Sequence, residues 1–344
     1  MTTGAAGRVL VTGGAGYIGS HTVKGLAQAG YDVCVYDSLL AGHRQAVDRI
    51  TEAFPERKIT FVKGDIRDRA LLVSALKESG AQAVLHFAAL LSVAESVREP
   101  IRYYDNNVGG TLSLLGAMTE AGVNQLVFSS TAATFGEPLV TPIDETHPQS
   151  PINPYGETKL VIERVLKSLE AAKGFRHVVF RYFNAAGADP DGFLGEDHEP
   201  EEHLIPRTIL AATTGVPLHV FGDDYDTPDG TCVRDFIHVT DLADAHLAGL
   251  RELEAGARSA SYNLGMGDGV SVRDVIASVT RVLGKDVPHV YAPRRAGDPS
   301  RLVASSARAR AELGWTPRLS DIDTIVATAW KWHEKNPKGY GTGE

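Results

Sequence analysis

Residues 9–21 constrain the fold more than any other segment, because an apolar run there breaks into spaced glycines and then continues in a helical pattern. The segment reads Val-Leu-Val-Thr-Gly-Gly-Ala-Gly-Tyr-Ile-Gly-Ser-His. Gly13, Gly16 and Gly19 suit a tight turn, close backbone approach to a pyrophosphate and close packing of a helix on a strand. The helix N-terminus presents unpaired N–H groups to an anion. We expect this turn, with Tyr17 and Ile18, to bind a dinucleotide.

The second apolar stretch indicates which dinucleotide is bound. Residues 32–36 are followed directly by Asp37, which lies 18 residues after Gly19. In a dinucleotide-binding sheet, a carboxylate at this place binds the adenine-ribose hydroxyls and repels a 2′-phosphate. The sequence therefore predicts NAD as the cofactor in preference to NADP.

The composition is that of an ordinary cytosolic enzyme. Hydrophobic residues make up 43% of the chain and charged residues 22%, and the formal net charge of −9 disfavours nucleic acid as a partner. No apolar run reaches the roughly 18 residues that a membrane span needs, and the first residues carry no apolar export signal. Cys34 and Cys232 form neither a disulfide pattern nor a metal pattern. We expect a cytoplasmic protein without a membrane partner or a metal.

Short apolar strands alternate with amphipathic helical stretches along the first half of the chain. Strands are expected near residues 8–12, 32–36, 59–62, 83–86, 125–129 and 177–182. This alternation predicts an α/β fold with a Rossmann-like, doubly wound parallel sheet. Polar, turn-rich connections after residue 185 predict a smaller C-terminal α/β domain for the substrate. We expect an NAD-binding domain over 1–184, rejoined by about 235–255, and a mainly substrate-binding domain over 185–344.

A tyrosine and a lysine four residues apart indicate the chemistry. Asn153 is a suitable N-cap and Pro154 a suitable first helical residue, so Tyr155 and Lys159 share one helix face. The ammonium is expected to lower the pKa of the phenol toward neutrality and make it a usable acid or base. Thr131 follows the strand 125–129, where its hydroxyl can bond the reacting oxygen of an alcohol while a nicotinamide takes the hydride.

Several segments carry a family resemblance that covers nearly the whole chain. They are residues 13–21, 64–66, 86–88, 103–108, 153–156, 181–184, 229–238 and 290–298. In these segments the chain resembles the extended short-chain dehydrogenase/reductases and, more closely, the UDP-glucose 4-epimerases. The resemblance implies an NAD-dependent isomerase that interconverts UDP-glucose and UDP-galactose through a 4-keto intermediate. It also implies a homodimer formed by the helix that begins near Asn106 and the helix that carries Tyr155.

The resemblance also assigns roles to individual residues. Tyr155 would be the base, Lys159 would lower its pKa and hold the nicotinamide ribose, and Thr131 would bond the reacting oxygen. The expected cofactor-binding residues are Gly13, Gly16, Tyr17, Ile18, Gly19, Asp37, Asp65, Ile66, Phe87, Ala88, Asn106, Ser129, Tyr155, Lys159 and Tyr182. The expected substrate-binding residues are Thr131, Tyr155, Asn184, His203, Leu204, Val220, Phe221, Arg234, Arg295, Asp298 and Leu302.

The chain departs from the family at two places, and other functions stay open. Leu91 replaces a lysine that many epimerases carry, and Leu302, at the position that limits the sugar pocket, is intermediate in size. A 4-epimerase of UDP-N-acetylglucosamine, UDP-glucuronate or UDP-xylose is therefore an alternative. A 4,6-dehydratase would need a carboxylic acid pair after Thr131, where Ala132 and Ala133 stand. A non-catalytic NAD-binding protein is the remaining alternative.

Overall fold

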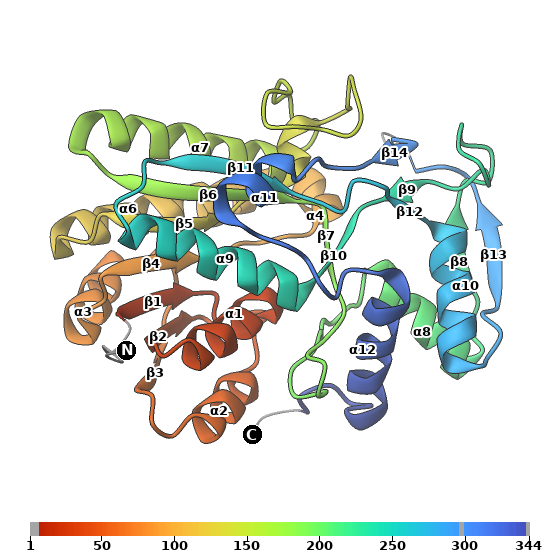
Figure 1. Cartoon of the computed structure of the whole chain (residues 1–344), viewed down its shortest axis with the longest axis horizontal. Coiled ribbons are helices and arrows are strands. Elements are labelled where there is room, and N and C mark those ends of the chain that lie inside the picture. Colours follow the sequence, from red (N-terminus) through yellow and green to blue (C-terminus); the bar gives the residue numbers. More distant parts are fainter. Residues whose placement is uncertain (1–6, 296–298, 342–344) are drawn as a thin grey trace.

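A seven-stranded parallel sheet lies at the centre of the computed structural model, which describes residues 7–295 and 299–341. The strand order is β11-β6-β5-β4-β1-β2-β3 (Figure 1). All six expected strands are present, each within one residue of its expected bounds, but sequence analysis missed β11. The strands are β1 (Arg8–Thr12), β2 (Asp32–Asp37), β3 (Ile59–Lys63), β4 (Ala83–His86), β5 (Gln125–Ser129), β6 (Arg176–Tyr182) and β11 (Ala260–Leu264).

Helices cover both faces of this sheet, which confirms the Rossmann-like, doubly wound fold. Side chains of β1 alternate between two cores: Val9 and Val11 belong to one and Leu10 to the other, as expected for a strand buried on both faces. Helices α1 (Tyr17–Gln28), α2 (Arg44–Ala53) and α9 (Val239–Glu254) contribute to the core of Val9, which also includes Ala309 and Trp332. Three others contribute to the core of Leu10, namely α3 (Arg69–Ser79), α6 (Gly110–Ala121) and α7 (Pro154–Lys173).

The strand order reverses beside β1, which pairs with β2 on one side and with β4 on the other. In an open parallel sheet, the crossover connections diverge at such a reversal and leave a crevice at the carboxyl ends of the strands. Thr12 and His86, the last residues of β1 and β4, are paired there, and the Thr12 hydroxyl lies 2.7 Å from His86 Nδ1. The topology therefore places a ligand crevice directly after these residues.

A second core lies beside the central sheet, at the right of Figure 1. It is formed mainly by α8 (Leu204–Thr214), α10 (Val272–Leu283) and α12 (Ile322–Lys335), together with short strands. Ser271 and Asp274 form a capping box that starts α10. The short strands are β8 (Leu218–Phe221), β9 (Val233–Arg234), β12 (Val270–Ser271), β13 (His289–Ala292) and β14 (Arg301–Leu302).

The chain passes between the two cores more than once. The short strand β10 (Phe236–His238) does not join the central sheet but pairs with β7 (Asn184–Ala186). After it, α9 packs on α1, and β11 adds to the edge of the sheet beside β6. The remaining helical segments are α4 (Val93–Arg98), α5 (Pro100–Tyr103), the π-helix η1 (Tyr104–Gly109), the 3-10 helix η2 (Ala132–Phe135) and α11 (Ala307–Leu313). Within the described residues, no helix combines the length and the apolar character that crossing a membrane requires.

Candidate active site

A cavity of about 1470 Å³ opens at the carboxyl ends of the central strands. Every residue expected to bind the cofactor lines it: Gly13, Gly16, Tyr17, Ile18, Gly19, Asp37, Asp65, Ile66, Phe87, Ala88, Asn106, Ser129, Tyr155, Lys159 and Tyr182. These residues come from segments that are far apart in the sequence. The structure thus brings together a set that sequence reasoning could only place strand by strand.

The glycine turn after β1 has the shape that a pyrophosphate cradle requires. Gly13 has a φ of +71°, and a Cβ there would lie 2.5 Å from the amide nitrogen of Ala88. A Cβ on Gly19 would lie 2.0 Å from the carbonyl oxygen of Gly13. Gly16 precedes α1 as its N-cap and supplies no side chain to the first N–H groups, so these remain available to an anion. The turn therefore fits a dinucleotide.

Asp37 stands at the end of β2 on the wall of the cavity. The backbone amide of Ala15 donates to its Oδ2 at 3.0 Å, and that of Leu39 donates to Oδ1 at 2.8 Å. Burial raises the pKa of this carboxyl, and the two amides act against that rise. The carboxylate is held in one orientation, as a group that binds ribose hydroxyls needs to be.

Tyr155 and Lys159 lie in the first turns of α7, as the predicted helix start at Asn153 implies. Asn153 caps α7 by accepting from the amide of Gly156 at 2.8 Å, and Pro154 is in the first turn. Lys159 Nζ lies 6.0 Å from the centre of the Tyr155 ring and donates to the carbonyl oxygen of Ser129 at 2.8 Å. These contacts place the ammonium, the phenol and the end of β5 together on the cavity wall.

The expected lowering of the phenol pKa was wrong for the protein as the structure describes it. Burial raises the pKa of Tyr155 to about 12, and a hydrogen bond with the Thr131 side chain opposes this only in part. Burial also lowers the pKa of Lys159 to about 7, against the influence of Glu163. The physical reason is shared: both groups lie in a poorly hydrated place, which disfavours the charged form of each.

A buried polar network holds the end of β5 in place. Arg181 Nη2 donates to Glu163 Oε2 at 2.6 Å, and the Ser130 hydroxyl donates to Glu163 Oε1 at 2.6 Å. Burial would raise the pKa of Glu163, but Arg181, Ser130 and Gln149 outweigh it and lower the pKa. The neighbouring Ser129 hydroxyl lies 2.5 Å from the hydroxyl of Tyr182. These bonds fix the backbone from which Thr131 projects.

The residues expected to bind the substrate divide between two adjoining cavities. Thr131, Tyr155, Asn184, His203, Arg234, Arg295 and Leu302 line the large cavity. Leu204, Val220 and Phe221 instead line a second cavity of about 210 Å³ on the side of α8 and β8. Both cavities share Asn184, His203, Arg234 and Arg295. The Arg295 guanidinium lies 4.0 Å from the centre of the Phe221 ring. Asp298 lies outside the described residues.

Sequence analysis missed several charged residues of the large cavity. Arg207 lies one turn after His203 on α8 and faces both cavities. The spacing of four residues from His203 was the signal that could have found it. Glu196, His198 and Glu202 also line the large cavity. Leu91, whose side chain is exposed, also lines the large cavity.

Comparison with known proteins agrees with this geometry. Residues 9–265 match the model of the NAD dependent epimerase/dehydratase family. The chain belongs to this family. It is 50% identical to a UDP-glucose 4-epimerase of Lacticaseibacillus casei over 334 residues, which cover 97% of this chain and 98% of that protein.

Solved structures are similar over the same extent. The UDP-glucose 4-epimerase of Brucella ovis in complex with NAD has a TM-score of 0.90 at 50% identity and covers 95% of this chain and 98% of its own. The enzyme of Bifidobacterium longum in complex with NAD+ and UDP has a TM-score of 0.90 at 40% identity and covers 96% of this chain and 99% of its own.

Proposed function

We propose that this protein is an NAD-dependent UDP-glucose 4-epimerase that interconverts UDP-glucose and UDP-galactose. The observation that carries the proposal is the convergence of Tyr155, Lys159 and Thr131 on the cavity that the glycine turn and Asp37 also line. Its relatives of about 50% identity over nearly the full chain are UDP-glucose 4-epimerases, which supports the same reading.

The reaction assigns one task to each of the three residues. Tyr155 removes the proton from the sugar C4 hydroxyl and later returns it, as a positioned phenol can. Thr131, which already hydrogen-bonds the phenol, holds the reacting oxygen. Lys159 Nζ lies 6.0 Å from the centre of the Tyr155 ring, and its ammonium form favours the phenolate during the reaction. Hydride acceptance and return are the chemistry that NAD supplies when it is bound.

The substrate is expected to lie between the two cores. Arg234, Arg295 and Arg207 all border both cavities, and planar guanidinium groups suit bidentate contacts with diphosphate oxygens. Asn184, His203 and Leu302 line the large cavity beside them. We place the sugar toward Thr131 and the uridine toward Leu204, Val220 and Phe221. A dehydratase is disfavoured, because Ala132 and Ala133 offer no carboxylic acid after Thr131.

We also propose a homodimer in the cytoplasm. Large apolar side chains are exposed on neighbouring elements of one region: Val97 on α4, Ile101 on α5, Tyr104 on η1 and Leu112 on α6. These elements contact one another in sequence and α7 packs against η1, and exposed apolar side chains gathered in one region mark a protein interface. Light scattering of the purified protein is expected to give twice the chain mass, and a monomer mass would contradict the dimer.

One incubation tests the function. Purified protein is mixed with UDP-galactose without added NAD, and the C4 epimers are followed by proton NMR. We expect UDP-glucose to appear until the two sugars reach equilibrium. Tyr155→Phe removes only the hydroxyl, so turnover is expected to fall by about 100- to 10,000-fold while UDP binding, measured by calorimetry, stays. Conversion by the variant at the wild-type rate would refute the base. No conversion by the wild type, with or without added NAD, would refute the proposed function.

A further inference from the structure

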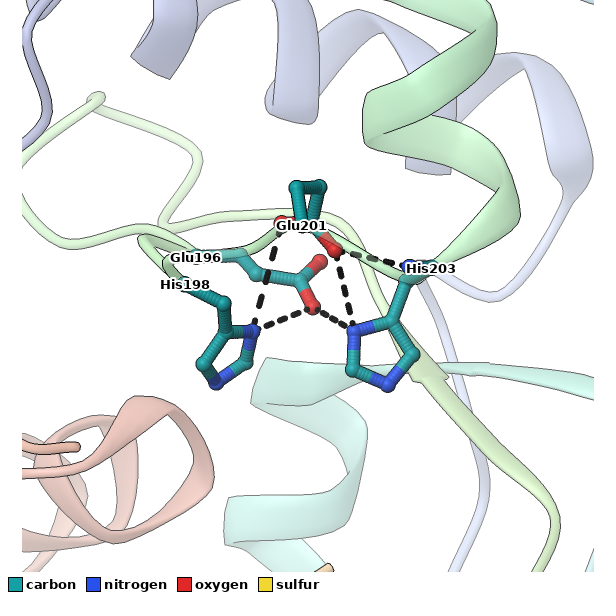
Figure 2. Close-up of side chains that lie close together, drawn as sticks. All are labelled: Glu196, His198, Glu201 and His203. Atoms are coloured by element: carbon teal, nitrogen blue, oxygen red, sulfur yellow. Dashed lines mark hydrogen bonds and ion pairs between the residues drawn. The ribbon is translucent and has the colours of Figure 1, made fainter. Parts of the chain in front are cut away.

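Four potential metal ligands converge in the segment that leads into α8. Glu196, His198, Glu201 and His203 each offer one ligand atom, and these atoms all lie within 4.8 Å of one another. Figure 2 shows the two imidazoles turned toward the two carboxylates. Among the described residues, no other cluster of at least three histidines, cysteines or acids has this arrangement.

Two of the distances between the imidazole nitrogens and the carboxylate oxygens are close to those of a coordination sphere. Ligands about 2.0 to 2.2 Å from a tetrahedral zinc ion lie about 3.3 to 3.6 Å from each other. His198 Nδ1 lies 3.2 Å from Glu196 Oε1, and His203 Nδ1 lies 3.3 Å from Glu201 Oε1. Two further distances lie outside this range: His203 Nδ1 is 2.6 Å from Glu196 Oε1, and His198 Nδ1 is 3.9 Å from the other Glu201 oxygen, Oε2.

The buried atoms of the cluster lack proper hydrogen bonds. Glu196 Oε1, His198 Nδ1 and His203 Nδ1 are buried, yet none of them has a hydrogen-bond partner of acceptable geometry. The Glu196 side chain is only 5% exposed. Buried polar atoms are rarely left in this state. These atoms contact one another as ion pairs without good hydrogen-bond geometry, and a cation bound among them would satisfy them.

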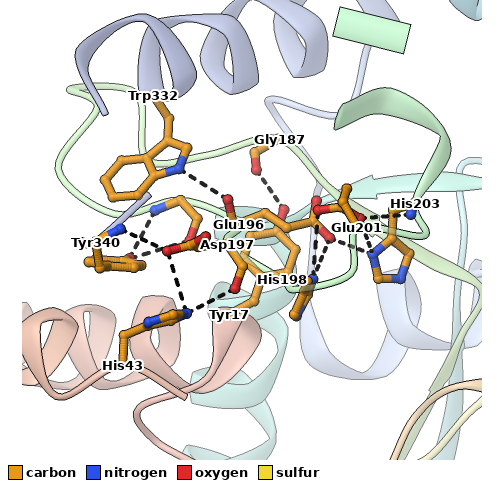
Figure 3. A network of polar contacts seen from close by, with 11 residues as sticks. Tyr17, His43, Gly187, Glu196, Asp197, His198, Glu201, His203, Trp332 and Tyr340 are labelled. Carbon is orange, nitrogen blue, oxygen red and sulfur yellow. Dashed lines mark hydrogen bonds and ion pairs between the residues drawn. The ribbon is translucent and has the colours of Figure 1, made fainter. Parts of the chain in front are cut away.

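Contacts from distant parts of the chain fix the segment in this shape (Figure 3). Trp332 Nε1 donates to the carbonyl oxygen of Glu196 at 3.1 Å, and the amide of Tyr340 donates to Asp197 Oδ2 at 2.7 Å. His43 Nε2 lies 2.9 Å from the carbonyl oxygen of Asp197. The Tyr17 ring meets the His198 ring edge-on, with 6.3 Å between centres. The ligand positions are therefore preorganised by the tertiary structure.

We propose that Glu196, His198, Glu201 and His203 form a binding site for a divalent transition-metal ion of the zinc type. Two imidazoles with two carboxylates suit Zn²⁺, whereas Mg²⁺ prefers oxygen ligands and retains its waters. The ion reaches the site through the large cavity, which Glu196, His198 and His203 line. The bound ion would join the connection from β7 to the first turn of α8 and stiffen that wall of the cavity.

The test is metal binding by the intact, tag-free protein. Chelator-treated protein is dialysed against Zn²⁺ or Mg²⁺ alone, and the bound metal is measured by elemental analysis. We expect one Zn²⁺ and no Mg²⁺ per chain. Co²⁺ is expected to give the intense visible absorption of a tetrahedral site. Failure to retain Zn²⁺, or a weak octahedral Co²⁺ spectrum, would overturn the proposal.

Variants assign the metal to the cluster. His198→Ala and Glu201→Gln are each expected to weaken Zn²⁺ binding by more than about 100-fold. Loss of a residue that only hydrogen-bonds a metal ligand already weakens binding by about 10- to 100-fold, and these two substitutions remove a ligand itself. Glu202→Gln and His289→Ala are the matched controls: Glu202 accepts from Ser92 instead, and His289 is exposed on β13. Both are expected to bind Zn²⁺ like the wild type. Circular dichroism checks that each variant folds. Undiminished binding by folded His198→Ala and Glu201→Gln proteins would refute the assignment.

Discussion

The burial of Lys159 should make the stability of the cofactor-free protein depend on pH. Its pKa falls from the usual 10.5 to about 7 in the folded protein because burial disfavours the charged ammonium, with Glu163 acting in the opposite direction. Between these two pH values the unfolded chain therefore binds more protons at this site than the folded chain does. Stability is consequently lost as the pH falls toward 7 and regained as it rises.

The size of this change in stability follows from the distance between the two pKa values of Lys159, about 7 in the folded chain and 10.5 in the unfolded chain. Between these pKa values, each pH unit changes the free energy of unfolding by about 1.4 kcal/mol. From pH 7 to pH 9 the wild-type protein should gain about 2 kcal/mol from this residue, since near pH 7 the folded lysine is itself about half protonated. Lys159→Met keeps the length of the side chain but removes the titration, so the variant should lack this gain.

Urea unfolding of cofactor-free wild type and Lys159→Met at pH 7, 8 and 9 measures the difference. Other titrating groups are common to both proteins and cancel in the comparison. The variant is expected to become progressively less stable relative to the wild type as the pH rises. A difference that stays constant between pH 7 and pH 9 would show that the folded protein keeps the proton on Lys159, and the burial argument would be wrong.

Three further substitutions test other parts of the site and fold. Glu163→Gln leaves Arg181 buried without its ion pair, so urea unfolding should show a free energy of unfolding lower by about 3 to 5 kcal/mol. The control Glu157→Gln, on the same helix, should lower it by less than about 1 kcal/mol. Equal losses in the two variants would contradict the importance of the pair. Asp37→Asn should weaken NAD binding, measured by calorimetry, by about 10- to 100-fold, because a hydrogen bond to a charged group contributes about 1.5 to 3 kcal/mol. NADP binding should weaken less. An equal loss of affinity for NAD and NADP would refute the charge argument. Ser271→Ala removes the cap of α10 and should lower stability by about 1 kcal/mol in thermal unfolding, and an unchanged midpoint would count against the capping box.

Local signals were enough to predict six of the seven strands of the central sheet and the cofactor turn. The alternation around β1 and the glycines at 13, 16 and 19 depend on backbone geometry and on neighbouring residues alone. The cap of α7 is equally local, and Asn153 indeed bonds the amide of Gly156. The strand β11 was missed because its pairing partner, β6, lies about 80 residues earlier in the chain.

The sequence by itself determined six of the seven strands of the central sheet, the glycine turn and the pairing of Tyr155 with Lys159 on one helix face, since each is set by residues close to one another in the chain. Only the tertiary structure decided the protonation of that pair, the division of the substrate residues between two cavities and the convergence of Glu196, His198, Glu201 and His203. A pKa depends on how much water remains around a group. That is set by segments remote in the chain, which pack together only when the whole fold has formed.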